Sequence, residues 1–258
     1  MHQHSTLRNL HNNSRFYILV WAVLGSIGIA CWLRLRLPGD QVYYIRTEQT
    51  FGLVSICLWY VALVLSPLHR VVGDRAWMKH LLFARRAIGV SAAYFALLHT
   101  SISLWGQLGG LDGIALLPPL FKWALGLGVL ALLQLSIMAG TSFDKVVAFF
   151  TYPRWKIIHR FSYPAGVLVI LHVWLIGTHA ASLAVTLAGF VALAFLFGLE
   201  AIRGGQTLAK KFASARAYRL ELTVALWVAA LSLLAAMPLA VSNYHSRKHS
   251  TVHGVYHE

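Results

Sequence analysis

The sequence predicts an all-α fold, a polytopic transmembrane helix bundle of about seven helices with a cytoplasmic N-terminus. Apolar residues make up 58% of the 258 residues and charged residues only 12%, and the mean hydropathy is +0.65. A helix needs about 20 consecutive apolar residues to cross the hydrocarbon core of a bilayer, and runs of this length recur along the chain. The spans therefore use almost all of the sequence, as expected for one membrane domain.

Each expected span is an apolar run bounded by charged residues or by Pro and Gly. Only Ala180 and Ala181 separate the fifth span from the sixth, so these two helices are expected to form a tight hairpin or to divide slightly differently. The seven helices are expected near residues 16–33, 50–68, 87–108, 122–141, 161–179, 182–202 and 222–242.

The distribution of basic residues predicts the orientation. Of the 22 Lys and Arg residues, 16 fall in the segments on the side of the N-terminus. Cytoplasmic loops carry an excess of Lys and Arg, so the N-terminus is expected in the cytoplasm. The net charge of +14 is then mainly a topology signal, with membrane lipid as the expected partner of the basic loops. No nucleic acid is expected as a partner, because no folded basic surface with base-reading side chains is visible.

Two histidines, His99 and His172, each lie in the middle of an apolar stretch, where an imidazole is costly and needs a partner. His99 follows Arg86 by 13 residues, and His172 follows Arg160 by 12. At 1.5 Å per residue, both rings are expected about 18–20 Å from the cytoplasmic edge. Two imidazoles at one depth predict a haem b held between two helices, with His99 and His172 as axial iron ligands.

Two other interpretations of this pair remain open. The histidines could be hydrogen-bonded to neighbouring backbone carbonyls without any cofactor. A transition-metal site is the other, although no membrane-embedded Asp, Glu or Cys is expected to supply further ligands. Cys31 and Cys57 are the only cysteines, so no disulfide framework or iron–sulfur cluster is expected.

A third histidine, His159, precedes His172 by 13 residues, or about 20 Å of helix rise, which suits an inner cofactor site. A straight helix would turn the two rings onto different faces, and Pro164 between them is expected to kink it. The positions where a second ligand would be needed hold Arg85 and Arg86, which bind iron poorly but propionate or phosphate well. The sequence therefore predicts one haem and leaves a second open, with His159, Arg85 and Arg86 as candidate cofactor contacts.

The segments FARRAIGVSAAYFALLHTS and WKIIHRFSYPAGVLVILH resemble the ferric reductase-like transmembrane domain family. Within it, the pattern is most similar to the haem-binding membrane subunits of bacterial periplasmic methionine sulfoxide reductase systems. They share an Arg-Arg pair, a histidine 13 residues later and two later histidines 13 residues apart. The likeness covers roughly residues 50–180 and implies a six-helix core, to which the seventh helix expected here is an addition.

The resemblance implies a b-type cytochrome that carries electrons across the bacterial inner membrane, with His99 and His172 as axial ligands and His159 near an inner site. After the last span, too little chain remains for a flavin and nicotinamide domain, and no strand followed by a glycine-rich turn appears. Electrons are expected from quinol, from a bound flavin such as FMN, or from a redox partner protein. They are expected to leave to an extracytoplasmic reductase or metal acceptor.

The chain is thus expected to comprise a cytoplasmic segment at 1–15, a haem-binding bundle at 16–242 and an extracytoplasmic tail at 243–258. Two alternative functions stay open, a structural haem subunit of a larger redox complex and a histidine-lined metal or proton transporter. The tail has a histidine every fourth residue, which suits loose metal binding, docking on a partner or a simple solvated end. These tail histidines are His245, His249, His253 and His257.

Overall fold

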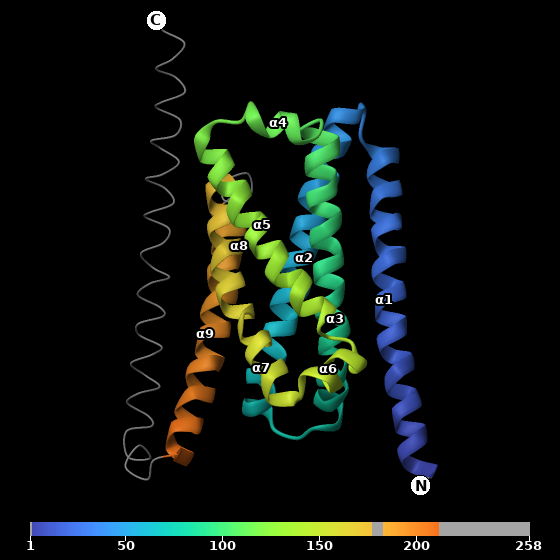
Figure 1. Ribbon diagram of the computed structural model, residues 1–258, viewed down its shortest axis with the longest axis vertical. Coiled ribbons are helices and arrows are strands. Elements are labelled where there is room, and N and C mark those ends of the chain that lie inside the picture. Colours follow the sequence, from blue (N-terminus) through green and yellow to red (C-terminus); the bar gives the residue numbers. More distant parts are fainter. Residues whose placement is uncertain (1, 177–182, 212–258) are drawn as a thin grey trace, which may run out of the picture. The chain divides into compact units, whose positions relative to one another are not determined.

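The computed structural model describes residues 2–176 and 183–211, and over these ranges the chain forms helices joined by short turns, with no strand (Figure 1). The elements are α1 (His2–Arg36), α2 (Asp40–Val72), α3 (Ala76–Ile102), the π-helix η1 (Ser103–Gln107), α4 (Leu111–Ala115), α5 (Pro119–Gly140), α6 (Asp144–Phe150), α7 (Tyr152–Arg160), α8 (Ser162–Ile176) and α9 (Leu183–Lys211).

Six segments of the described chain are long and apolar enough to cross a membrane, which confirms the polytopic all-α prediction for the first six spans. The expected Ala180–Ala181 turn, the seventh helix at 222–242 and the histidine tail lie outside the described residues. The spans are Arg15–Arg36, Asp40–Val72, Ala76–Gln107, Pro119–Gly140, Tyr152–Ile176 and Leu187–Thr207.

The second span begins ten residues earlier than expected, at Asp40 instead of residue 50. The added turns contain polar residues such as Arg46 and Glu48, which end an apolar run but do not end a helix. A helix can extend past the apolar run because its backbone hydrogen bonds are satisfied internally. This extension places Glu48 inside the span, where the sequence alone predicted no embedded carboxylate.

The chain divides into two compact units. The first contains Met1–Ser66 and Asp74–Ile170, and the second contains Pro67–Gly73 and Leu171–Glu258. His99, His159, Arg85 and Arg86 belong to the first unit, and His172 belongs to the second.

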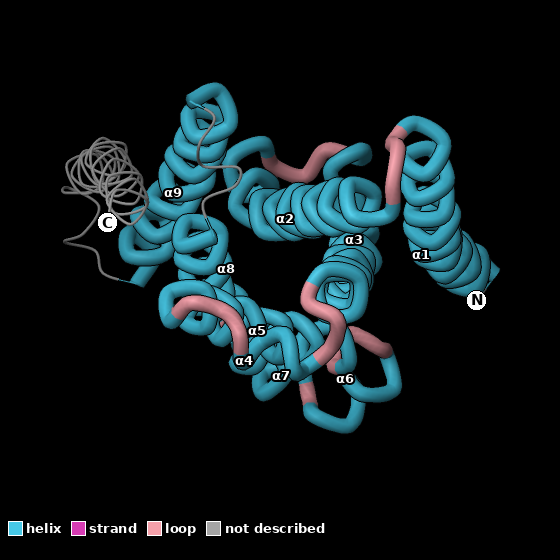
Figure 2. The backbone as a smooth tube through the Cα atoms, turned by 90° about the horizontal axis from the view of Figure 1, so that it is seen from above, coloured by secondary structure: helices cyan, strands magenta, loops and turns pink. Residues whose placement is uncertain are grey.

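In the first unit, α3 contacts both α1 and α5, and Figure 2 shows α1 beside α3 on the side away from α5. The core forms around Trp59 of α2, whose side chain is 7% exposed. Small residues of α3 and α8, including Ala92 and Ala165, let the helices approach this indole closely. The Ser55 hydroxyl also donates a 2.8 Å hydrogen bond to the Ala92 carbonyl, which ties α2 to α3.

Large apolar side chains also lie on the outside of the first unit. The indoles of Trp21, Trp105 and Trp123 are 70%, 68% and 73% exposed. In water such surfaces would be costly, whereas lipid tails and the membrane interface favour them. The exposed aromatic surface therefore agrees with a chain that spans a bilayer.

The fifth span is divided between two helices. The expected kink is a break at Phe161, between the end of α7 at Arg160 and the start of α8 at Ser162. Pro164 has no backbone N–H and cannot donate to the Arg160 carbonyl, so a regular helix cannot continue through this turn. His159 and His172 thus lie on different helices, and the rotation calculated for one straight helix does not apply.

Candidate functional site

His99 lies near the end of α3, and its ring is held by a backbone carbonyl of α2. The Nδ1 atom is 3.0 Å from the carbonyl oxygen of Glu48. A carbonyl oxygen can only accept, so Nδ1 carries the proton and the imidazole lone pair resides on Nε2. Metal-binding histidines commonly show this arrangement, in which the second ring nitrogen donates to a carbonyl or carboxylate. His99 therefore has the tautomer of an Nε2 iron ligand.

Glu48 also brings a carboxylate to this position. Its Oε1 atom is 3.8 Å from His99 Nδ1, and its side chain is 13% exposed. Sequence analysis missed Glu48 because the second span was expected to begin only at residue 50. The acidic residue in a helical segment that continues directly into an apolar run was the signal that could have found it.

His172 lies on α8 in the second unit, and its side chain is half-buried. The expected match in depth between His99 and His172 joins residues of the two units and stays a prediction. Among residues 2–176 and 183–211, no group of three or more His, Cys, Asp or Glu side chains is arranged to hold a metal ion.

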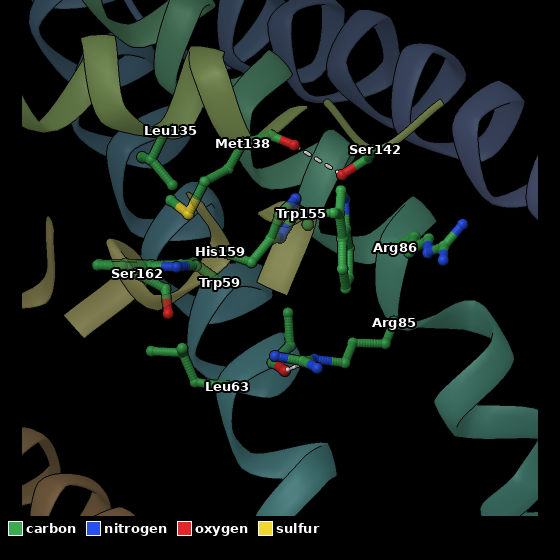
Figure 3. Close-up of a pocket in the computed structure, with 12 residues that line it drawn as sticks. Trp59, Leu63, Arg85, Arg86, Leu135, Met138, Ser142, Trp155, His159 and Ser162 are labelled. Carbon is green, nitrogen blue, oxygen red and sulfur yellow. Dashed lines mark hydrogen bonds between the residues drawn. The ribbon is translucent and has the colours of Figure 1, made fainter. Parts of the chain in front are cut away.

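A pocket of about 70 Å³ lies in the first unit, at the opposite end of α3 from His99 (Figure 3). Two indoles and an imidazole form part of its wall, and two guanidinium groups supply positive charge. The structure thus brings together three residues that the sequence singled out for an inner site, together with aromatic residues that it did not. Residues that define this inner pocket are Trp59, Arg85, Arg86, Met138, Trp155 and His159.

Hydrogen bonds fix the ring of His159 at the inner pocket. Its Nε2 atom is 3.2 Å from the Thr141 hydroxyl, and that hydroxyl is 2.8 Å from the Ile137 carbonyl. The hydroxyl proton goes to the carbonyl, so the hydroxyl oxygen accepts from His159 Nε2–H. The ring also lies on the Trp155 indole, with 4.0 Å between the ring centroids. Iron binding through Nε2 would therefore replace the hydrogen bond to Thr141.

The second arginine is linked to the same indole. The Arg86 guanidinium lies 5.1 Å from the centre of the Trp155 ring, and it forms a 2.8 Å ion pair with Asp144. Asp144 also pairs with Arg15 of α1 at 3.0 Å. The Trp155 N–H donates to the Thr141 carbonyl at 2.9 Å. These contacts join α1, α3, α6 and α7 beside the pocket.

Asp144 is the acidic centre of this cluster, and we expect the Asp144→Asn substitution to lower the free energy of unfolding by about 0.5–1 kcal/mol. The effect is small because the carboxylate is 65% exposed and solvent screens both ion pairs. Thermal unfolding in detergent at low and high salt measures it, with Asp112→Asn in α4 as the matched control. A loss of 2 kcal/mol or more, or one independent of salt, would contradict this interpretation.

Arg85 reaches the pocket from the preceding position of α3. Its Nε donates a 2.7 Å hydrogen bond to the Ala62 carbonyl of α2, which orients the guanidinium. Figure 3 shows Arg85 and Arg86 on the same side of the pocket as Trp155. The pocket thus combines flat aromatic walls with two cations, a combination that suits a planar group bearing carboxylates or phosphates.

Fold and site together define a class, the polytopic helical membrane proteins with histidines within their spans. The model of the family described as ferric reductase like transmembrane component matches residues 51–170. No solved structure matches the chain.

Curated relatives narrow the class further. The chain is 30% identical over 158 residues to the protein-methionine-sulfoxide reductase heme-binding subunit MsrQ of Bordetella parapertussis, which covers 59% of this chain and 72% of the relative. MsrQ of Ralstonia nicotianae is 29% identical over 167 residues, covering 58% of this chain and 73% of the relative. MsrQ of Xanthomonas campestris pv. campestris is 27% identical over 158 residues, covering 60% and 70%. The chain belongs to the MsrQ family of ferric reductase-like membrane proteins, and is a multi-pass protein of the bacterial inner membrane.

Proposed function

We propose that the chain is a b-type cytochrome subunit that relays electrons across the inner membrane, with one haem held between α3 and α8. His99 and His172 are its axial ligands. The observation that carries this proposal is the hydrogen bond from His99 Nδ1 to the Glu48 carbonyl, because it places the lone pair of a half-buried imidazole on Nε2. The relatives' printed name, a heme-binding subunit, supports the same cofactor.

The residues present fit this cofactor. Two neutral imidazoles supply the nitrogen ligands that haem iron accepts, and apolar helix faces supply a dry environment for the macrocycle. Haem supplies a one-electron carrier when it is bound. The chain's own part is to hold the iron, to set its potential through axial ligation and to fix the distance from each membrane face.

We further propose that the inner pocket takes a second haem, with His159 as its protein ligand and Arg85 and Arg86 as propionate partners. Several described contacts support the fit. The indole of Trp155 and the imidazole of His159 are already stacked, which offers a flat apolar surface. Both guanidinium groups line the pocket, and Arg binds carboxylates through paired hydrogen bonds. His159 and His99 lie toward opposite ends of the first unit's helices, as a relay across a membrane requires.

The donor and the acceptor follow from the orientation that the basic residues favour. With the N-terminus in the cytoplasm, the inner pocket faces the cytoplasm, and His99 faces the outer half of the membrane. Electrons enter from quinol, FMN or a redox partner protein, and leave to an extracytoplasmic reductase or metal acceptor. The reductase is favoured because the relatives are named as subunits of a protein-methionine-sulfoxide reductase. Anionic membrane lipid surrounds the basic loops.

A pyridine haemochrome spectrum of the purified full chain, with the haem-to-protein ratio, tests the proposal. We expect a Soret band, a reduced α-band and two haems b per chain. A structural haem subunit would give the same spectrum, but reduction of its haem would not drive reduction by the purified native complex. A colourless protein with metal or proton transport activity would instead establish the histidine-lined transporter.

A further inference from the structure

We infer that α2 holds the ring of His99 in place through Gly52 and the Glu48 carbonyl, which makes Gly52 a positioning residue for the outer haem. The inference rests on the proposed function, in which His99 binds iron. Its basis is the close approach of the two helices at this one point. A Cβ atom at position 52 would lie 3.0 Å from His99 Nδ1 and 3.2 Å from Cε1. Real Cβ atoms rarely come this close to a neighbour, so the imidazole occupies space that only glycine leaves.

The position of Gly52 in the helix explains why glycine matters there. Residue 52 is four positions after Glu48, so within α2 its N–H donates to the same carbonyl oxygen that His99 reaches. Side chains at i and i+4 lie on one face of a helix, one above the other. A side chain at position 52 would therefore cover the Glu48 carbonyl. Without one, the second lone pair of that oxygen is accessible to the His99 ring.

Other contacts fix α2 against α3 on both sides of this point. Toward one end, a Cβ at Gly106 would lie 2.7 Å from the Tyr44 ring, so these elements also pack closely there. Toward the other end, Ser55 donates to the Ala92 carbonyl at 2.8 Å. The carbonyl of Glu48 consequently has little freedom to follow a displaced imidazole. A change at position 52 must be absorbed by the His99 ring.

The hydrogen bond has a direct electronic consequence for iron. An imidazole that donates Nδ1–H to a carbonyl is a more basic ligand at Nε2, and it favours the ferric over the ferrous state. Weakening that bond should raise the reduction potential. Tilting the ring should also change the anisotropy of the low-spin ferric EPR signal. A purely structural role of Gly52 would move neither quantity.

The test compares Gly52→Ala and Gly52→Val with Gly28→Ala, a glycine in the α1 span whose Cβ would meet nothing within 4 Å. We expect Gly52→Ala to keep haem, to shift the outer haem's potential to a more positive value and to alter its EPR signal. Gly52→Val should lower haem affinity about 10–100-fold, the usual effect of losing a partner of a metal ligand. Alanine favours a helix over glycine, so Gly52→Ala carries no loss of helix propensity.

A parallel His99→Ala variant separates failure of this inference from failure of the proposed function. If His99→Ala keeps the wild-type haem content and potentials, the proposed ligand is wrong. If His99→Ala loses one haem while Gly52→Ala matches Gly28→Ala in potential and EPR signal, only the role of Gly52 is overturned. Gly52→Ala decides the matter even if Gly52→Val does not fold.

Discussion

Replacing His99 with alanine is expected to remove the outer haem, so that the ratio of haem to protein falls from two per chain to one. The reason is that a methyl group cannot bind iron, and one remaining axial imidazole in an apolar site does not compensate for the missing ligand. His172→Ala should give the same spectrum, because both substitutions leave the same cofactor with one ligand. Reduced-minus-oxidised spectra and pyridine haemochrome titration of the purified variants measure the change.

Controls for this prediction come from histidines outside the proposed site. His80 lies on α3 with His99 but is exposed, so His80→Ala should keep both haems. His245→Ala in the C-terminal tail should keep them as well. A His99→Gly variant leaves space for a free ligand, and added imidazole should restore its Soret intensity. Two haems per chain in His99→Ala, or different spectra for His99→Ala and His172→Ala, would show that these histidines are not the axial pair.

The membrane fold could be predicted because its signals are local. Hydrocarbon thickness sets the length of an apolar run, and the cost of unpaired backbone groups makes each run a helix. The start of α2 escaped prediction for the same reason. Asp40, Arg46 and Glu48 end the apolar run, and only the packing of α2 on α3 shows that the helix extends beyond it.

The site could be predicted only where sequence spacing determines a contact. His99 and His159 stood out because an imidazole in an apolar segment needs a partner. Trp155 and His159 are four residues apart, so a helix over 152–160 would have predicted their stacking. The carbonyl that holds His99 comes from 51 residues away, and Asp144 reaches Arg86 across 58 residues. Such long-range contacts depend on tertiary packing, which a single sequence does not specify.

The two interpretations of Arg85 and Arg86 illustrate the same limit. As flanks of a span, they agree with the positive-inside rule and need no cofactor. The structure places both at the inner pocket, one hydrogen-bonded to the Ala62 carbonyl and the other between Asp144 and the Trp155 ring. Topology and cofactor binding thus make the same demand on these positions, and composition alone cannot separate them.

The second large effect concerns His159. We expect His159→Ala to remove the inner haem and to leave the outer haem's spectrum and potential unchanged. The two sites are independent in this respect because about 20 Å of α3 separates Arg86 at the inner pocket from His99. The haem-to-protein ratio should fall to one, and chemical reduction from the cytoplasmic side of oriented vesicles should become slower. His159→Ala combined with His99→Ala should give a colourless protein.

A matched variant, Thr141→Val, distinguishes an iron ligand from a hydrogen-bonded structural histidine. Valine keeps the shape of threonine but removes the hydroxyl that accepts from His159 Nε2. If His159 binds iron through Nε2, that hydrogen bond is absent in the haem-loaded protein, so Thr141→Val should retain two haems. If His159 only packs and hydrogen-bonds, His159→Ala should keep the wild-type haem ratio, while both variants should lose a similar part of their thermal stability. The inner pocket would then position the electron donor through Arg85 and Arg86, because its two guanidinium groups and the Trp155 ring do not depend on the imidazole for their charge or their aromatic surface.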